Sequence, residues 1–340
     1  MLSFINYPGW LKPEIIPGLP VRWYGLMYLV AFSIAYLLFR KQIREGALEA
    51  GDDDVAGFFF AGILGLLLGA RLFAVTIYDP TGYYLRKPWY IFWPFDESGR
   101  FVGLQGMSYH GGVAGCITGT LIYCRVHRKN WLHWADTLIA GLPLGYTFGR
   151  LGNFINGELW GRVTTMGWGV VFPHAPRIPV NTPWLADFAR KAGVEISRIA
   201  RSVNLPRHPS QLYEAFFEGL VLWALLWFVF RKRKAFHGAL VSLYLMGYGL
   251  FRFFIEYTRE PDADMGFLFS FSGSDGDTAL FSSFFNFSTG QFLCFLMILA
   301  GGVLYLFLKH RSSRPAAAPA EQPSVPSASS ARRKIRKKLK

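Results

Sequence analysis

Hydrophobic residues gather into seven long blocks along the chain, and the stretches between these blocks are polar. The blocks cover residues 21–39, 55–78, 108–126, 134–150, 211–231, 237–257 and 291–309. Each has about the length that an α-helix needs to cross a bilayer, which is roughly 20 residues. The fourth block is interrupted by Gly141, Pro143 and Gly145, and membrane helices tolerate such breaks when neighbouring groups satisfy the freed backbone. The pattern predicts an all-α integral membrane protein with about seven transmembrane helices.

Basic residues mark one side of the predicted membrane. They follow the first, third, fifth and seventh blocks, at residues 40–44, 125–129 and 231–234 and in the C-terminal tail. Because short loops rich in Lys and Arg stay in the cytoplasm, we expect the N-terminus outside and the C-terminus inside. The segment 151–210 then becomes a small external domain between spans four and five. Its seven Lys and Arg residues are weak counter-evidence, since long loops translocate largely regardless of charge.

The net charge of +14 is concentrated near the C-terminus. From Lys309 to Lys340 there are ten Lys and Arg residues and one acid, Glu321. We interpret 311–340 as a disordered basic cytoplasmic tail that lies near anionic headgroups. A nucleic-acid-binding arm is the alternative for such a charge run. Residues 1–310 form the predicted transmembrane domain, and its first span, which lacks the features of a cleaved signal peptide, should remain in the mature protein.

Six of the predicted helices carry polar residues at their external ends. These residues are Arg22, Tyr24, Arg71, His110, Arg150, His208, Gln211, Tyr213, Glu214, Tyr248, Arg252 and Glu256. An arginine at the bilayer centre costs about 2.5–3.5 kcal/mol on insertion scales, so Arg71, Arg150 and Arg252 need compensation. A planar guanidinium can donate two hydrogen bonds to one phosphate. The pattern therefore favours a water-accessible cationic pocket for an anion. Snorkelling, or pairing with Glu214 or Glu256, is the structural alternative.

Five motifs, in order along the chain, resemble the bacterial prolipoprotein diacylglyceryl transferase family. The longest covers residues 149–162 and reads GRLGNFINGELWGR. The others are RWYGLMY at 22–28, GMSYHGG at 106–112, RHPSQLYE at 207–214, and FRFFIEY with REPD at 251–257 and 259–262. The likeness covers about residues 5–310. The loop 269–287 looks longer than the family's usual loop, and the tail lies beyond the likeness.

The resemblance implies a transfer reaction at the periplasmic face of the bacterial inner (cytoplasmic) membrane. The diacylglyceryl group of phosphatidylglycerol would move to the lipobox cysteine thiol of a preprolipoprotein, and glycerol phosphate would leave. This is the first step of lipoprotein maturation. The expected partners are phosphatidylglycerol, the preprolipoprotein signal peptide and membrane lipids, without nucleic acid. We expect no cofactor and no metal, because no cluster of His, Cys and carboxylate residues has ligand spacing in the sequence.

The resemblance also implies which residues form the site. The family's functional positions fall on Tyr24, His110, Arg150, Asn153, Glu158, Tyr248, Arg252 and Glu256. We expect Arg150 and Arg252 to hold the phosphate and to stabilise the departing charge. His110 is either the base that ionises the substrate thiol or a group that hydrogen-bonds the lipid. The remaining five would bind substrate or, like Glu256, orient an arginine.

An anion transporter is the main alternative function. It too would place arginines inside a helical bundle. It should show polar groups through the full depth of the membrane, or two similar halves. The sequence shows polar groups in one leaflet and no internal repeat, so the transferase is the preferred hypothesis.

Overall fold

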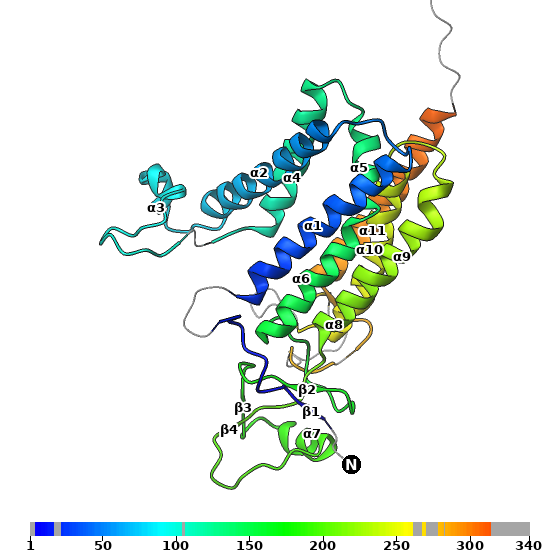
Figure 1. The fold of residues 1–340 in the computed structure, drawn as a ribbon. Helices are drawn as coiled ribbons and strands as arrows, with labels where there is room; N and C mark the ends of the chain where they lie inside the picture. Colours follow the sequence, from blue (N-terminus) through cyan, green and yellow to red (C-terminus); the bar gives the residue numbers. More distant parts are fainter. Residues whose placement is uncertain are drawn as a thin grey trace, which may run out of the picture.

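The chain is mostly helical (Figure 1) in a computed structural model that describes residues 4–16, 22–103, 106–260, 267–269, 278–281 and 283–313. Within these ranges, five helical segments are long and apolar enough to cross a membrane. They are α1 (Trp23–Arg44), α2 (Asp52–Ile77), the segment Ser210–Arg233, the segment Ala239–Thr258 and α11 (Thr289–Ser312). The prediction of an all-α membrane protein is confirmed at this level.

Helices also occupy the other two predicted blocks, although neither is among those five. The third block is α4 (Tyr109–Val126), whose hydrophobic residues are diluted by glycine and threonine. The fourth block is two helices, α5 (Trp131–Ile139) and α6 (Leu142–Asn156), separated at Ala140 and Gly141. We expected this block to end at Arg150, but α6 continues for six more residues. Arg150 therefore lies within a helix rather than at its exit.

The fifth block is not a uniform α-helix. It comprises α8 (Ser210–Glu214), η2 (Ala215–Val221), α9 (Leu222–Ala224), η3 (Leu225–Phe230) and η4 (Arg231–Arg233). Both η2 and η3 are π-helical. Such widened turns are rare and are frequent at functional sites. The sixth block is α10 (Ala239–Ile255), which continues into the 3-10 turn η5 (Glu256–Thr258).

Two groups of helices can be distinguished in Figure 1. The helices α2 and α4 form a pair that stands apart from the bundle of α1, α6, α9, α10 and α11. A Cβ atom on Gly115 would lie 2.0 Å from the carbonyl oxygen of Gly65, so the two backbones are in direct contact. Small residues at such crossings let helices approach closely. At one end of the pair, a core that includes Phe39, Phe58 and Trp134 joins α1, α2 and α5.

A small unit of short strands lies beyond the lower ends of α6 and α8 in Figure 1. Strand β1 (Ile5–Asn6) pairs in parallel with β2 (Val170–Val171), and β3 (Ile178–Pro179) pairs antiparallel with β4 (Ser202–Val203). The short helix α7 (Leu185–Ala192) packs its buried face into a core with Val163, Val203 and Leu205. Apart from β1, the strands and the helix of this unit come from the segment 151–210.

The remaining elements are short. The helix α3 (Tyr83–Arg86) and the turn η1 (Pro88–Ile91) follow α2. Strands β5 (Phe267–Phe269) and β6 (Phe287–Ser288) pair antiparallel just before α11. Most of the predicted tail 311–340 lies outside the described residues, as does part of the loop 269–287.

Candidate active site

One buried carboxylate, that of Glu214 on α8, binds three arginines. Its Oε1 lies 2.7 Å from Nη1 of Arg252 and 2.7 Å from Nη1 of Arg259. Its Oε2 lies 2.8 Å from Nε of Arg150. The Glu214 side chain is fully buried, whereas the three arginine side chains keep 17–19% of their surface. The acid therefore anchors the guanidinium groups from behind and leaves part of each one open.

Tyr146, which lies on the same helix as Arg150, is a second contact of the Arg150 guanidinium group. The Nε of Arg150 donates to the hydroxyl oxygen of Tyr146, one turn earlier on α6, at 2.7 Å. The guanidinium carbon also lies 4.9 Å from the centre of the Tyr146 ring. Within the described residues, neither Nη group of Arg150 has a hydrogen-bond partner. These two groups are thus available to bind an anion.

Arg252 is oriented from its own helix. Its Nη2 lies 3.1 Å from Oε2 of Glu256, one turn later. The other oxygen of Glu256 accepts a hydrogen bond of 3.2 Å from the Ser288 hydroxyl at the start of α11. Arg259 lies 3.6 Å from the same Oε2 of Glu256. Glu256 therefore contacts both Arg252 and Arg259.

A further carboxylate lies deeper in the cluster. Glu218 on η2 is fully buried, and its Oε2 accepts a hydrogen bond from the Tyr146 hydroxyl. Its Oε1 lies 3.8 Å from Nη1 of Arg252, which is beyond hydrogen-bonding distance. The ring of Tyr248 packs edge-on against Tyr146, with 5.9 Å between centroids. Tyr248 therefore lines the same region as the arginines.

The C-terminal end of α6 carries a second hydrogen-bonded group. Gly157 ends the helix in the left-handed conformation, with φ of +65°, which glycine adopts without strain. The turn brings Glu158 back toward the helix, where its Oε1 accepts from Asn153 at 2.9 Å and from Asn156 at 3.3 Å. Leu159 has φ of +57°, a rare conformation for a branched residue that is often found at functional sites. Asn153 and Glu158 are thus brought together as one unit.

Tyr24 lies at the start of α1, next to this unit. Its hydroxyl is 2.7 Å from that of Tyr28, and it is within electrostatic range of Glu158 and Arg150. The helices α1 and α6 meet here, since a Cβ atom on Gly152 would lie 3.2 Å from Met27. The structure therefore brings seven of the eight predicted residues into one region: Tyr24, Arg150, Asn153, Glu158, Tyr248, Arg252 and Glu256.

His110 is the exception. It is exposed on the first turn of α4, and its Nδ1 lies 3.5 Å from the hydroxyl of Tyr78. No described contact joins its side chain to Arg150 or Arg252. The preceding residue, Tyr109, is within electrostatic range of both arginines and of Tyr248. In this conformation the motif thus presents its tyrosine, rather than its histidine, to the cluster.

Arg71 does not join the anion pocket that we expected it to share with the other two arginines. Its guanidinium donates to the carbonyl oxygens of Ile91, Tyr90 and Gly106. It also lies over the ring of Tyr84, 4.8 Å from the centroid. Arg71 therefore links α2 to the segment that follows it, and these contacts have a structural role.

His208 borders the site from the loop before α8. Burial and the nearby charge of Arg162 lower the pKa of His208 to about 4. The neutral ring lies 3.2 Å from the Tyr213 hydroxyl, which also accepts a hydrogen bond of 2.7 Å from Trp168. Because that hydroxyl accepts from Trp168, it can donate its proton to Nδ1 of the neutral His208.

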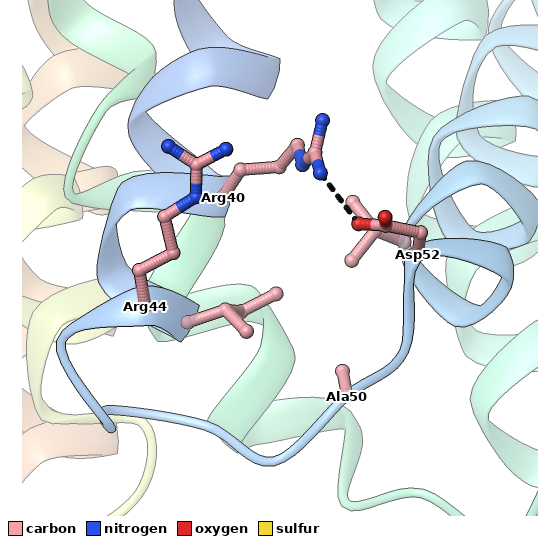
Figure 2. Close-up of a pocket in the computed structure, with 6 residues that line it drawn as sticks. Arg40, Arg44, Ala50 and Asp52 are labelled. Atoms are coloured by element: carbon pink, nitrogen blue, oxygen red, sulfur yellow. Dashed lines mark hydrogen bonds and ion pairs between the residues drawn. The ribbon is translucent and has the colours of Figure 1, made fainter.

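The pocket in Figure 2 is remote from this cluster. It is lined by Arg40, Arg44, Ala50 and Asp52 together with two aliphatic residues, and Arg40 pairs with Asp52 at 2.7 Å. These residues surround the turn between α1 and α2, at the end of α1 opposite Tyr24. At about 40 Å³ the cavity has room for only a few water molecules. We therefore do not assign it to catalysis.

Four important members of the cluster are not among the site residues predicted from the sequence. They are Glu214, which was considered only as a pairing partner for arginine, and Glu218, Arg259 and Tyr146. A signal for Glu218 was present, since an acid within a membrane helix marks a functional site by default. Arg259 stands in a quoted motif, but its link to Glu214 depends on the turn η5. Tyr146 carries no such signal, because tyrosine is common in membrane helices.

The cluster has the chemistry to bind a phosphate ester and to stabilise the negative charge that develops when its ester bond breaks. Three guanidinium groups are preplaced in a water-poor region, where such donors stabilise developing negative charge without reorganisation. Three carboxylates, Glu214, Glu218 and Glu256, balance their charge when all six groups are ionised. The three arginine side chains keep 17–19% of their surface exposed, whereas Glu214 is fully buried, so an anion that reaches the cluster can contact the arginines.

Comparison with known proteins identifies the family of the chain. The family model described as prolipoprotein diacylglyceryl transferase matches residues 14–307. The protein named phosphatidylglycerol–prolipoprotein diacylglyceryl transferase in Treponema pallidum is 51% identical over 92% of this chain and 97% of its own length. The proteins of the same name in Treponema denticola and Chlorobaculum tepidum are 50% and 41% identical, also over 92% of this chain, and cover 97% and 96% of their own lengths. The chain belongs to the prolipoprotein diacylglyceryl transferase family.

Proposed function

We propose that this protein transfers the diacylglyceryl group of phosphatidylglycerol to the lipobox cysteine of preprolipoproteins and releases glycerol phosphate. The observation that carries the proposal is the arginine cluster on Glu214, within a chain of this family. Arg150 and Arg252 bind the headgroup phosphate with their open guanidinium surfaces. As the ester bond breaks, they stabilise the additional charge on the leaving group.

The other site residues position these two arginines and the lipid. Glu214 and Glu256 hold the guanidinium planes, as their 2.7 Å and 3.1 Å contacts to Arg252 indicate. Asn153 and Glu158, which are bonded to each other, offer hydrogen bonds to the glycerol hydroxyl groups. Tyr24 and Tyr248 line the lipid path. His110, on the separate α2–α4 pair, binds the lipid or the peptide rather than the phosphate.

We further propose seven membrane spans, with the two helices α5 and α6 together forming the fourth. The long contact of α4 with α2 through Gly65 and Gly115 supports the third span. The packing of α6 against α1 through Gly152 supports the fourth. A broken span of this kind is compatible with a bilayer where neighbouring helices surround it.

The proposed orientation places the arginine cluster at the periplasmic face of the inner membrane. At the ends of the helices that lie away from the arginine cluster, basic residues form ion pairs with acidic ones. Examples are Arg40–Asp52, Lys129–Asp54 and Arg231–Glu45. Lys and Arg in short loops mark the cytoplasmic side. Residues 1–310 then form the transferase domain, with 151–210 as a periplasmic insertion where the peptide docks, and 311–340 as a basic cytoplasmic tail.

A reconstituted assay tests the activity. Purified protein in phosphatidylglycerol nanodiscs is incubated with a lipobox peptide, and mass spectrometry follows the gain of one diacylglyceryl group on cysteine. A peptide with serine in place of cysteine is the matched control. The Treponema pallidum relative serves as a reference. Absence of modification under conditions in which that relative is active would refute the proposal, whereas uptake of an anion into vesicles would favour the transporter.

Accessibility labelling tests the orientation. Single cysteines are introduced at Glu195, in the insertion, and at Lys232, after the fifth span, in a variant that lacks the three native cysteines. We expect a membrane-impermeant maleimide to label Glu195→Cys in intact spheroplasts and Lys232→Cys only after lysis. The reverse pattern would invert the topology.

A further inference from the structure

The transfer reaction produces a proton that the arginine cluster by itself cannot accept. The substrate thiol must become a thiolate to attack carbon, and a free thiol has a pKa of about 8.5. Arginine stays protonated at any physiological pH. The proton therefore needs a basic group close to the arginines, and Glu214, Glu218 and Glu256 are the carboxylates of the cluster.

Two of these carboxylates make close contacts with arginine. Glu214 lies within 2.8 Å of three guanidinium groups. Glu256 contacts Arg252 at 3.1 Å and accepts from Ser288. Glu218 differs, because its nearest guanidinium group is 3.8 Å away. One oxygen of each of the three carboxylates has no hydrogen-bond partner among the described residues, so this distance is what sets Glu218 apart. Of the three, Glu218 is the one that can take up a proton without breaking an arginine contact.

The Tyr146 hydroxyl connects Glu218 with the site. It donates its proton to Oε2 of Glu218 and accepts the Nε–H of Arg150 at 2.7 Å. Tyr146 is partly exposed, whereas Glu218 is fully buried. A hydroxyl oxygen has two lone pairs, so the second can accept a proton from a thiol placed beside Arg150. The π-helical turn of η2 carries Glu218, and such turns recur at functional sites.

We propose that Glu218 is the proton acceptor of the diacylglyceryl transfer, reached through the hydroxyl of Tyr146. This inference rests on the proposed function, with the headgroup phosphate at Arg150 and Arg252. The thiol S–H bond breaks and its proton passes to the Tyr146 oxygen, while the Tyr146 proton passes to Oε2 of Glu218. The thiolate forms a C–S bond to the glyceryl carbon, and the C–O bond to phosphate breaks with its electron pair.

The charges balance in this step. Before transfer, three arginines and three carboxylates sum to zero, and the phosphodiester carries one negative charge. After transfer, protonated Glu218 leaves the cluster at +1, and the phosphate monoester that departs is a dianion. The cluster thus becomes more positive in the same step in which the leaving group becomes more negative. This coupling stabilises the transition state where charge develops.

The test compares a cysteine peptide with a selenocysteine peptide. A selenol is more acidic than a thiol and is ionised at neutral pH, so it needs no base. We expect Glu218→Gln and Tyr146→Phe to lower kcat with the cysteine peptide by about 10²-fold or more. With the selenocysteine peptide, both variants should approach the wild-type rate. Raising the pH from about 7 to about 9, across the thiol pKa, should recover part of the cysteine activity.

Matched variants make the result decisive. Glu49→Gln, an exposed residue of the turn between α1 and α2, should leave both rates unchanged. If Glu218→Gln lowers kcat by the same factor with both peptides at every pH, Glu218 has a structural role and the proposal would be overturned. A third variant, His110→Gln, tests the histidine. If the selenocysteine peptide restores activity to His110→Gln but not to Glu218→Gln or Tyr146→Phe, the proposal would be overturned and His110 would be the proton acceptor. Failure of the wild type with both peptides would instead refute the proposed function.

Discussion

Nη1 of Arg252 lies 2.7 Å from Oε1 of Glu214, and this contact joins α10 to α8 inside the bundle. Neither residue would be stable there alone, since an isolated charge is costly to bury. The same carboxylate also holds Arg150 and Arg259. Glu214 is therefore the shared anchor of the cluster, and its removal affects all three arginines at once.

Glu214→Gln should therefore destabilise the protein and abolish transfer. Breaking a buried ion pair by removal of one partner costs about 3–5 kcal/mol, and here three cations lose their counter-charge. Thermal unfolding in detergent should show a lower Tm, and the peptide assay should show no product. Glu260→Gln is the comparison, since Glu260 pairs with Arg207 outside the cluster and its loss should affect Tm more than chemistry. A fully active Glu214→Gln variant would contradict the anchoring role.

Arg150→Lys and Arg252→Lys should each lower kcat by about 10²-fold or more. Lysine keeps the charge but lacks the planar fork that can donate two hydrogen bonds to phosphate, and losing one preplaced donor costs about that much. Initial rates of the peptide assay measure the effect. Arg125→Lys, an exposed residue in the last turn of α4, should leave the rate unchanged. If both cluster variants keep wild-type rates, the phosphate is bound elsewhere.

Gly115→Ala should separate α2 from α4. The added Cβ would lie 2.0 Å from the carbonyl oxygen of Gly65, so the backbones must move apart. We expect a lower Tm in detergent and a reduced yield of folded protein. Gly25→Ala on α1, where no atom lies within 4 Å of the added Cβ, should be neutral or slightly stabilising. Equal stability of the two variants would disprove the tight α2–α4 contact.

Acidification should destabilise the unit before α8 through His208. Its pKa is lowered to about 4 by burial and by Arg162, whereas an unfolded histidine has a pKa of about 6.5. Between these values the unfolded chain binds a proton that the folded chain excludes, so stability falls as the pH drops from about 6.5 to 4. With allowance for partial exposure, the loss is about 2 kcal/mol.

The His208 prediction is checked by Tm measured across this pH range. His208→Gln should be less stable than wild type near pH 7, because glutamine replaces the ring that Tyr213 contacts at 3.2 Å. The variant should also lose the part of the pH dependence that belongs to this residue. An unchanged slope in the variant would mean that other groups cause the acid sensitivity.

Much of the site could be predicted because it lies in motifs with fixed spacing. Arg252 on α10 and Glu256 at the start of η5 are four residues apart, and this spacing alone brings them within reach of each other. Asn153 and Glu158 also meet through a local turn. The position of His110 could not be predicted in this way, because it depends on how the α2–α4 pair stands relative to the bundle. The contacts of Arg71 could not be predicted either, since they include loop carbonyl groups.

The sequence by itself determined the membrane class, the positions of seven helical blocks and the residues of the family motifs. These properties follow from local hydrophobicity, glycine spacing and charge, which need no knowledge of the fold. Only the tertiary structure decided that Glu214 collects three arginines, that α6 extends past Arg150, and that Tyr146 links Arg150 to Glu218. The physical reason is that ion pairs and hydrogen bonds between helices depend on the packing of residues far apart in the chain.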